Sequence, residues 1–275
     1  MFNNHLNFIK PAIGIVDIMS KFENENKDST VKVWVAGASG FCGRGTIDAL
    51  LQETSKYSVL PHIRPSSHRF TKLNEVWKTQ GIQSITAEWT DLEPFMKEHT
   101  PQVIVSALGT TKKHARTGGG NYQEVDEGLN LSLIEWAQTY CPQAHFIYIS
   151  AMGVEWGRWN AYLRARMNVE TALKQSTLNY TIIRPGLLSG DSRDEKRSLE
   201  GMSSILSKGL TKLYLTLGLR KQAYKVRPLD APEMGLFIKA CIDDYYSKKS
   251  DGRRQNTYLL KEVYERLEQL DSFTF

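Results

Sequence analysis

The sequence has little cysteine: among its 275 residues, only Cys42, Cys141 and Cys241 carry a thiol. They form no C-x-x-C pair, and the histidines are not grouped with them at the spacing of a ligand set. This pattern argues against a disulfide framework and against a zinc site, so we expect no metal. Widely spaced free cysteines are typical of a reducing compartment, and we therefore expect the protein to be cytoplasmic.

Long apolar runs are also missing. No stretch reaches the ~18 apolar residues that a membrane-spanning helix needs, so we expect no membrane span. The apolar segment 11–19 is short, contains Asp17 and lacks a small-residue cleavage site. These features argue against a signal peptide.

Charge of one sign does not dominate the chain either. The net charge of +5 is mild and the basic clusters are short, which suits an anionic small ligand but does not indicate a nucleic-acid partner. The contents of 41% hydrophobic and 24% charged residues are ordinary for a folded domain. The length predicts one large domain, with at most a small appendage.

A glycine-rich turn is present between an apolar strand and an amphipathic helix, within residues 31–51. Its spacing is Gly37-x-x-Gly40-x-x-Gly43, which differs from the G-x-G-x-x-G of long-chain dehydrogenases. Because glycine has no Cβ, a peptide N–H can come close to a diphosphate, and the helix that follows directs its N–H groups and positive dipole end toward it. This context predicts a phosphate-binding loop, with a purely structural turn as the alternative.

Strands and helices alternate along the rest of the chain. The predicted strands cover 57–64, 82–87, 102–106 and 145–150, and a further strand ends at Arg184. The predicted helices cover 71–79, 122–139, 231–245 and roughly 257–270. This alternation predicts an α/β fold, a Rossmann-type doubly wound parallel sheet that binds its ligands at the carboxyl edge and has a small C-terminal substrate or lid region.

We divide the chain into three parts on this basis. Residues 1–30 are expected to form a flexible N-terminal extension that ends in a polar linker. Residues 31–250 form the nucleotide-binding domain, with a lid at about 190–225. Residues 251–275 form a helical tail, whose apolar face docks on the core or on a second subunit, so a homodimer is possible.

The end of the second predicted strand decides between NAD and NADP. A carboxylate there binds the ribose hydroxyls of NAD, whereas a basic side chain accommodates the 2′-phosphate of NADP. Residues 64–69 contain Arg64 and Arg69 but no acid, and Arg44 is a further cation at the same pocket edge. NADP is therefore favoured over NAD, although ordinary surface basicity would give the same residues.

Two further strand ends contribute candidate cofactor contacts. Glu88 or Asp91, after the third strand, could accept the amino hydrogens of adenine, and either could instead cap the next helix. Leu108, Gly109 and Thr110 follow the fourth strand, where small residues suggest that backbone comes close to a ligand. The residues assigned to cofactor binding are Gly37, Ser39, Gly40, Phe41, Cys42, Gly43, Arg44, Arg64, Glu88, Leu108, Gly109, Thr110 and Pro185.

The segment after the fifth strand carries candidate catalytic residues. Ser150 closes the strand, Tyr162 follows twelve residues later, and Arg166 lies four residues beyond it. On a helix, residues i and i+4 share a face, so Tyr162 and Arg166 are expected to face one site. A neighbouring cation lowers the pKa of a phenol, and a serine hydroxyl can hold the substrate oxygen. This set suits carbonyl reduction or alcohol oxidation beside a nicotinamide, with a packing tyrosine as the alternative.

The chain resembles an atypical short-chain dehydrogenase/reductase, and it is most similar to the Tat-interacting oxidoreductase family, with NmrA-like proteins further off. The resemblance covers about residues 31–243. The matching stretches are VAGASGFCGR, SALGTT, YQEVD, IYISAMGV, AYLRARMNVETAL and YTIIRPGLLSGDSRDE.

The resemblance implies an NADP-binding domain whose phosphate loop is formed by the glycine turn and Arg44. It also implies that Ser150 and Tyr162 are catalytic, and that the strand ending before Pro185 closes over the nicotinamide side. The sequence departs from the family where the lysine expected four residues after the tyrosine is Arg166. Arginine keeps the charge, but its planar head occupies a different volume.

Three functions follow from these observations. The first is an NADP-dependent oxidoreductase acting on an unidentified carbonyl or alcohol substrate. The second is an NADP(H)-sensing regulatory protein that acts through protein partners with little turnover, which the arginine at position 166 favours. The third, a sugar-nucleotide epimerase, is less favoured because the C-terminal portion is short.

Overall fold

A computed structural model describes residues 30–109, 122–188, 209–214, 216–219, 222–224, 227–247 and 254–270. In these residues, seven parallel strands form one sheet in the order β3-β2-β1-β4-β5-β6-β7. The strands are β1 (Val31–Ala36), β2 (Tyr57–Ile63), β3 (Ile85–Thr86), β4 (Val103–Ser106), β5 (His145–Ile149), β6 (Asn179–Arg184) and β7 (Gln255–Leu259). The predicted α/β fold with a doubly wound parallel sheet is confirmed.

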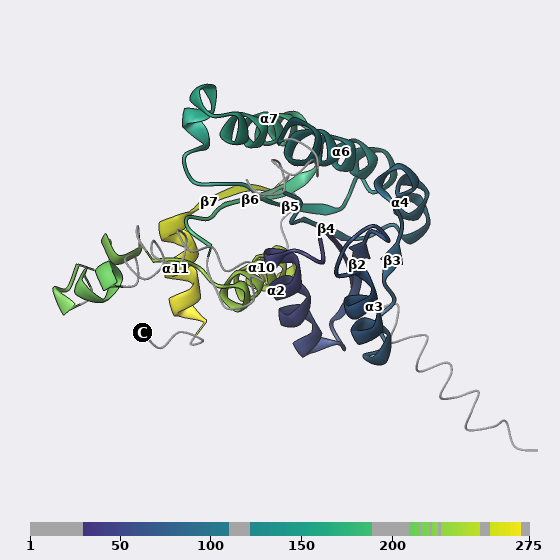
Figure 1. Ribbon diagram of the computed structural model, residues 1–275, viewed down its shortest axis with the longest axis horizontal. Coiled ribbons are helices and arrows are strands. Elements are labelled where there is room, and N and C mark those ends of the chain that lie inside the picture. Colours follow the sequence, from purple (N-terminus) through teal and green to yellow (C-terminus); the bar gives the residue numbers. More distant parts are fainter. Residues whose placement is uncertain are drawn as a thin grey trace, which may run out of the picture.

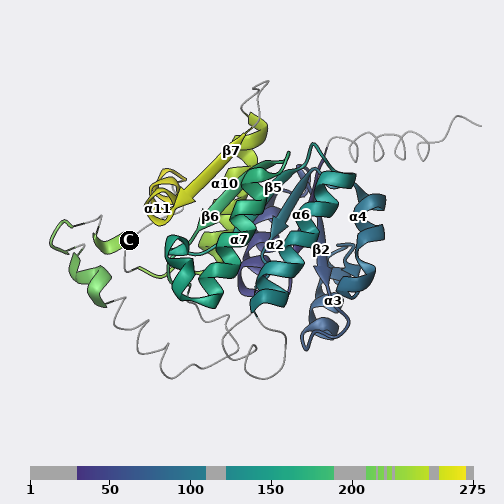
Figure 2. The same cartoon turned by 90° about the horizontal axis from the view of Figure 1, so that it is seen from above.

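Helices cover both faces of the sheet, as Figures 1 and 2 show. One face carries α2 (Phe41–Leu50), α3 (Phe70–Thr79), α10 (Ala231–Ser247) and α11 (Leu260–Gln269). The other face carries α4 (Glu93–His99), α6 (Leu129–Tyr140) and α7 (Ala161–Gln175). Short helical turns are η1 (Leu51–Glu53), η2 (Trp89–Asp91), η3 (Tyr122–Gly128) and η4 (Val154–Trp159). Alternate side chains of β1 enter the two cores, so both faces of this central strand are buried.

The C-terminal tail differs from its predicted form. The helix expected to begin near residue 257 is preceded by β7, which pairs in parallel with β6 from Tyr180↔Gln255 to Arg184↔Leu259. Most side chains of β7 are exposed, so the strand lacks the apolar alternation by which a strand is recognised in a sequence. The helix α11 then buries Val263, Tyr264 and Leu267 in the core. The tail is therefore part of the domain.

Two glycines bring α2 and α10 into backbone contact. A Cβ placed on Gly45 would lie 1.9 Å from the carbonyl oxygen of Ala231, and a Cβ on Gly235 would lie 1.9 Å from the carbonyl oxygen of Gly45. Only residues without a side chain allow this approach. The position of α2, which begins at the glycine turn, is thus fixed by α10.

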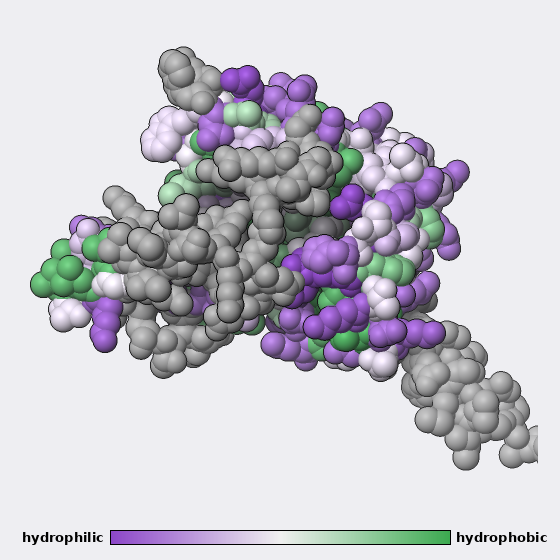
Figure 3. Space-filling model, viewed as in Figure 1, coloured by the Kyte–Doolittle hydropathy of each residue, from purple (hydrophilic) through white to green (hydrophobic). Residues whose placement is uncertain are grey.

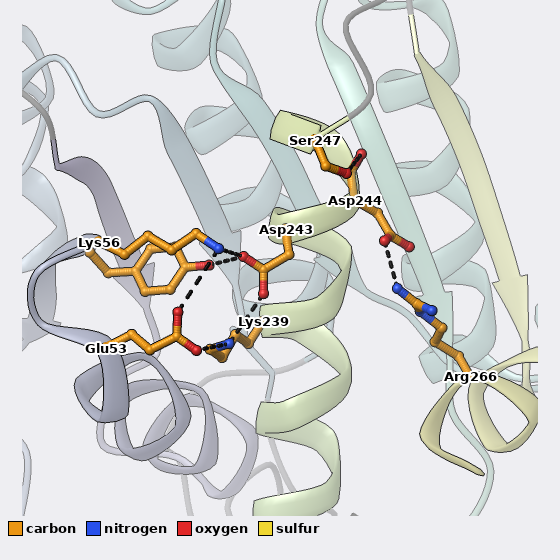
Figure 4. Close-up of polar contacts among 8 residues, drawn as sticks. Glu53, Lys56, Lys239, Asp243, Asp244, Ser247 and Arg266 are labelled. Atoms are coloured by element: carbon orange, nitrogen blue, oxygen red, sulfur yellow. Dashed lines mark hydrogen bonds and ion pairs between the residues drawn. The ribbon is translucent and has the colours of Figure 1, made fainter. Parts of the chain in front are cut away.

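A cluster of charges at the amino edge of the sheet also holds α10 in place (Figure 4). Asp243 accepts hydrogen bonds from Lys56, from Tyr57 and, at 3.1 Å, from Lys239. Lys239 also lies 2.5 Å from Glu53, the last residue of η1, which follows α2. Although burial alone raises the pKa of Asp243, these hydrogen bonds hold it below its ordinary value. The cluster stabilises the packing of α10. It lies at the edge of the sheet opposite the glycine turn, so we assign it no role in ligand binding.

The predicted lid is described only in part, and residues 189–208 lie outside the described ranges. Residues 209–219, apart from residue 215, are largely helical and protrude from the sheet in Figure 1. Hydrophobic residues gather on this protruding segment in Figure 3. Leu213, Leu217 and Leu219 of this segment are exposed. Within the described parts of the chain, no helix is both long and apolar enough to cross a membrane.

Candidate nucleotide-binding and catalytic site

The glycine turn lies at the carboxyl edge of the sheet, between β1 and α2. Gly37 has a φ of +79°, and a Cβ there would lie 2.7 Å from the carbonyl oxygen of Ala107 after β4. A Cβ on Gly43 would lie 2.2 Å from the carbonyl oxygen of Gly37. The turn is closed by a 2.9 Å hydrogen bond from the Gly40 N–H to the same carbonyl. Gly37 and Gly43 are thus required by close backbone packing, whereas a Cβ on Gly40 would lie 3.1 Å from the Gly37 carbonyl oxygen.

The amino end of α2 has the character of an anion site. Gly40 is its N-cap, no side chain caps the helix, and its first turn contains no acidic residue. The positive end of the helix dipole is therefore not neutralised by a carboxylate from this turn. Arg44 folds back over the turn, with its Nε 3.4 Å from the Gly40 carbonyl oxygen. These features fit a bound diphosphate.

The ends of β2 and β3 lie beside this turn. Arg69 donates a 3.0 Å hydrogen bond from Nη1 to the carbonyl oxygen of Ser39, which joins the loop after β2 to the glycine turn. Glu88, directly after β3, accepts hydrogen bonds from the Ser66 N–H at 2.8 Å and from the Ser66 hydroxyl at 3.0 Å. The sequence has no acid in the loop after β2, but the fold brings one there from β3.

Ser150, which follows β5, and Glu170, on α7, form a buried hydrogen-bonded pair. The Ser150 hydroxyl donates to Glu170 Oε1 at 2.7 Å. Arg184 donates to both oxygens of this carboxylate, from Nε at 2.9 Å and from Nη2 at 2.6 Å. Burial alone raises the pKa of Glu170, but the hydrogen bonds from Arg184 and Ser150 hold it below its usual range. Glu170 is therefore a carboxylate that can only accept hydrogen bonds.

Tyr162 and Arg166 share one face of α7, as their spacing predicts. The guanidinium carbon of Arg166 lies 5.3 Å from the centroid of the Tyr162 ring. Arg166 is buried, and its Nη2 lies 2.7 Å from a carboxylate oxygen of Asp126, which is also buried. Its Nη1 donates to the carbonyl oxygen of Ile149 at 2.8 Å.

The charge of Arg166 is retained despite its burial. Burial alone lowers its pKa, but Tyr148, Tyr162 and Asp126 together raise it above the ordinary value. A Cβ on Gly109 would lie 2.2 Å from Arg166 Nη2, so this glycine leaves room for the guanidinium group. The group that approaches Gly109 is therefore a side chain of the protein itself.

The remaining predicted site residues lie around this edge. Leu108 and Gly109 follow β4, with Leu108 beside Gly37 and Gly109 beside Arg166, while Thr110 lies outside the described residues. The carbonyl oxygen of Pro185 accepts a 2.9 Å hydrogen bond from the Met152 N–H, which joins the segments after β5 and β6. The binding and catalytic roles of all these residues stay predictions.

Three residues of the site were not predicted as functional: Asp126, Glu170 and Arg184. Asp126 lies within the stretch YQEVD that carries the family resemblance, and Glu170 continues the i, i+4 spacing of Tyr162 and Arg166. These signals identify candidate positions, but not the partners that the fold brings to them.

An open parallel sheet, with a glycine turn that leads from its central strand into the amino end of a helix, defines a nucleotide-binding protein of the Rossmann class. A family model described as NAD(P)H-binding matches residues 37–208, which is more than half of the chain. The chain belongs to this NAD(P)H-binding family. The narrower resemblance to the Tat-interacting oxidoreductase family stays a prediction.

Two curated relatives are mitochondrial fmp52 proteins from fungi. The protein of Emericella nidulans is 25% identical over 186 residues, which cover 67% of this chain and 78% of the relative. The protein of Aspergillus clavatus is 27% identical over 183 residues, which cover 66% of this chain and 76% of the relative. These names point to mitochondria, so the expectation of a cytoplasmic protein is wrong. Cysteine spacing reports only a reducing environment and does not distinguish the two locations.

Solved structures share the fold. UDP-glucuronic acid 4-epimerase from Bacillus cereus, in complex with NAD, has a TM-score of 0.55 and 15% identity, covering 89% of this chain and 85% of the epimerase. The FolM alternative dihydrofolate reductase 1 from Brucella canis, complexed with NADP, has a TM-score of 0.56 and 14% identity, covering 87% of this chain and 96% of the reductase. The two neighbours hold different cofactors, so the fold does not distinguish NAD from NADP.

Proposed function

We propose that the protein is an NADP(H)-dependent oxidoreductase that interconverts a carbonyl and an alcohol. The observation that carries this proposal is the placement of Tyr162 beside the buried charge of Arg166, at the same edge of the sheet as the glycine turn. A phenol next to a fixed cation is suited to proton transfer at a substrate oxygen. The relatives' names support a mitochondrial location.

Tyr162 is the proton-transferring group in this proposal. The bound cofactor supplies or accepts the hydride. Tyr162 gives its proton to the substrate oxygen during reduction and takes it back during oxidation. The positive charge of Arg166 offsets the negative charge that the phenol oxygen gains when its proton leaves, because the guanidinium carbon lies 5.3 Å from the ring centroid.

Ser150 holds the substrate oxygen, and Glu170 and Arg184 act as positioning residues for it. A serine hydroxyl has one hydrogen, which Ser150 donates to the Glu170 carboxylate at 2.7 Å. The serine oxygen then offers only lone pairs to the site. It accepts a hydrogen bond from a substrate alcohol. To hold a carbonyl oxygen, the hydroxyl turns its hydrogen from Glu170 to the substrate.

Removing the phenol oxygen tests the catalytic assignment. We expect Tyr162→Phe to lower kcat for NADPH-dependent reduction by about 100-fold across a panel of aldehydes and ketones, because one positioned acid is lost. The Kd for NADPH should stay within about twofold of the wild-type value, because the loss falls on the transition state. Tyr246→Phe removes a phenol oxygen near the amino edge, where Tyr246 contacts the Gln102 carbonyl, and is the matched control. Unchanged reduction by Tyr162→Phe would contradict the assignment.

A preference for NADP rests on Arg44 and Arg64, at the edge where the 2′-phosphate of the adenosine ribose would lie. Cations at this position favour a phosphate over a hydroxyl. We expect calorimetric titration to give a Kd for NADPH at least about tenfold lower than that for NADH, with Arg64→Ala removing most of the difference. Lys97→Ala removes an exposed charge on α4 and serves as the control. Tighter binding of NADH by the wild-type protein would contradict the preference.

A further inference from the structure

The loop after β2 already holds an anion supplied by the protein. The two carboxylate oxygens of Glu88 accept hydrogen bonds from the Ser66 N–H at 2.8 Å and from the Ser66 hydroxyl at 3.0 Å. A backbone N–H and a hydroxyl at the end of the second strand are donors that a 2′-phosphate would use, beside a cation such as Arg64. Glu88 therefore occupies donors that NADP would need.

This loop lies close to the glycine turn. β2 runs parallel to β1, from Val31↔Tyr57 to Val35↔Pro61, so the carboxyl ends of the two strands share an edge. The 3.0 Å hydrogen bond from Arg69 to the Ser39 carbonyl oxygen joins the loop after β2 directly to the turn. A dinucleotide whose diphosphate lies on the turn thus brings its adenosine ribose toward Ser66.

Glu88 is negatively charged at this position. The hydrogen bond from the Ser66 N–H lowers the pKa of Glu88 most. Burial opposes this, and the Ser66 hydroxyl and the charge of Arg64 lower the pKa further, so that it stays below its ordinary value. A phosphate monoester carries a charge of about −1.5 to −2 near pH 7. Two anions on the same pair of donors repel each other, whereas the 2′-hydroxyl of NAD can donate a hydrogen bond to the carboxylate.

We propose that Glu88 competes with the 2′-phosphate of NADP(H) for the Ser66 donors, and that this competition sets the choice of cofactor. The inference rests on the nucleotide site of the proposed function, but not on its chemistry. When NADP(H) binds, the phosphate takes the Ser66 donors and the carboxylate moves off them. When NAD(H) binds, Glu88 keeps these donors and accepts a hydrogen bond from the ribose hydroxyl. Glu88 is thus a specificity-determining residue in this proposal. It acts at the adenosine ribose, and not at the adenine amino group as the sequence suggested.

The test is a calorimetric titration of the full chain with NADPH, NADH and adenosine 2′,5′-bisphosphate. In Glu88→Gln, we expect about tenfold tighter binding of NADPH and of the bisphosphate, because one repelling charge is removed. Binding of NADH should weaken by about twofold to fivefold, because a neutral amide accepts a weaker hydrogen bond than a carboxylate. Glu75→Gln removes the same charge from an exposed side chain in α3 and should leave the ratio of the two affinities within about twofold of wild type.

Opposite changes for NADPH and NADH in Glu88→Gln alone support the competition. Equal changes for both cofactors, unchanged binding, or the same result from Glu75→Gln would overturn it. The glutamine amide of Glu88→Gln could still accept hydrogen bonds from Ser66. Glu88→Ser is therefore measured as well, because its short side chain cannot keep this contact. A wild-type protein that prefers NADH, but whose preference moves toward NADPH in Glu88→Gln, contradicts the proposed NADP dependence and supports the competition. The bisphosphate lacks a nicotinamide, so its binding is independent of any catalytic outcome.

Discussion

Replacing Gly235 by alanine is expected to destabilise the protein by about 3 kcal/mol or more, the upper part of the range for overpacked sites. The added Cβ would lie 1.9 Å from the carbonyl oxygen and 2.4 Å from the carbonyl carbon of Gly45. These are backbone atoms in the middle of α2, so no side chain can rotate away to make room. The helices α2 and α10 must separate, and the core between them loses contacts on both sides.

The same change is expected to weaken nucleotide binding, because α2 begins at the glycine turn. Gly43 and Gly37 are packed backbone to backbone, with 2.2 Å between a Cβ on Gly43 and the Gly37 carbonyl oxygen. A shift of α2 therefore moves the turn and its N–H groups. Nucleotide binding depends on the direction of these N–H groups, so even a small displacement of the turn weakens it.

Urea unfolding followed by circular dichroism measures the first effect, and calorimetry with NADPH measures the second. Gly209→Ala is the matched control, because a Cβ there meets no atom within 4 Å and its φ is not in the left-handed region. We expect this control to lie within about 0.5 kcal/mol of wild type. A Gly235→Ala protein as stable as this control would show that the two helices are not in backbone contact.

The central strands could be predicted from the sequence because their side chains are buried on both faces. Residues 103–106 and 145–149 are buried throughout, and runs of this kind are recognisable without knowledge of the fold. β7 could not be predicted in this way, because its residues are mostly exposed and its strand conformation depends on pairing with β6. Strand propensity of this kind is set by neighbours that are distant in the sequence.

The candidate site was predictable where its geometry is local. Tyr162 and Arg166 lie one helical turn apart, and the structure brings the guanidinium group beside the ring. Other contacts of the site join residues that are distant in the sequence. Asp126 is 40 positions from its partner Arg166, and Glu88 is 22 positions from its partner Ser66. No periodicity connects such pairs, because only the packing of strands and helices decides which side chains meet.

Replacing Arg166 by alanine is expected to destabilise the protein by about 3–5 kcal/mol, because it leaves the buried carboxylate of Asp126 without its counter-ion. Both groups are buried, and the ion pair spans 2.7 Å. The carbonyl oxygen of Ile149 also loses a 2.8 Å hydrogen bond from Nη1. Asp126→Asn should cost a similar amount, because the guanidinium charge is then the one left unpaired.

A double replacement distinguishes an ion pair from simple packing. If the penalty comes from an unpaired charge, Asp126→Leu combined with Arg166→Met should be less destabilising than Arg166→Ala alone, because neither charge remains buried. Arg166→Lys keeps a charge but has no planar head that reaches both Asp126 and the Ile149 carbonyl. We therefore expect its free energy of unfolding to lie between those of wild type and Arg166→Ala. Lys97→Ala, at an exposed position on α4, is the control. Urea unfolding at pH 7 measures the wild type and the five variants, and a double variant that is less stable than Arg166→Ala would contradict the buried pair. The result also bears on Tyr162, because the cation beside its ring is in place only while Asp126 holds it there.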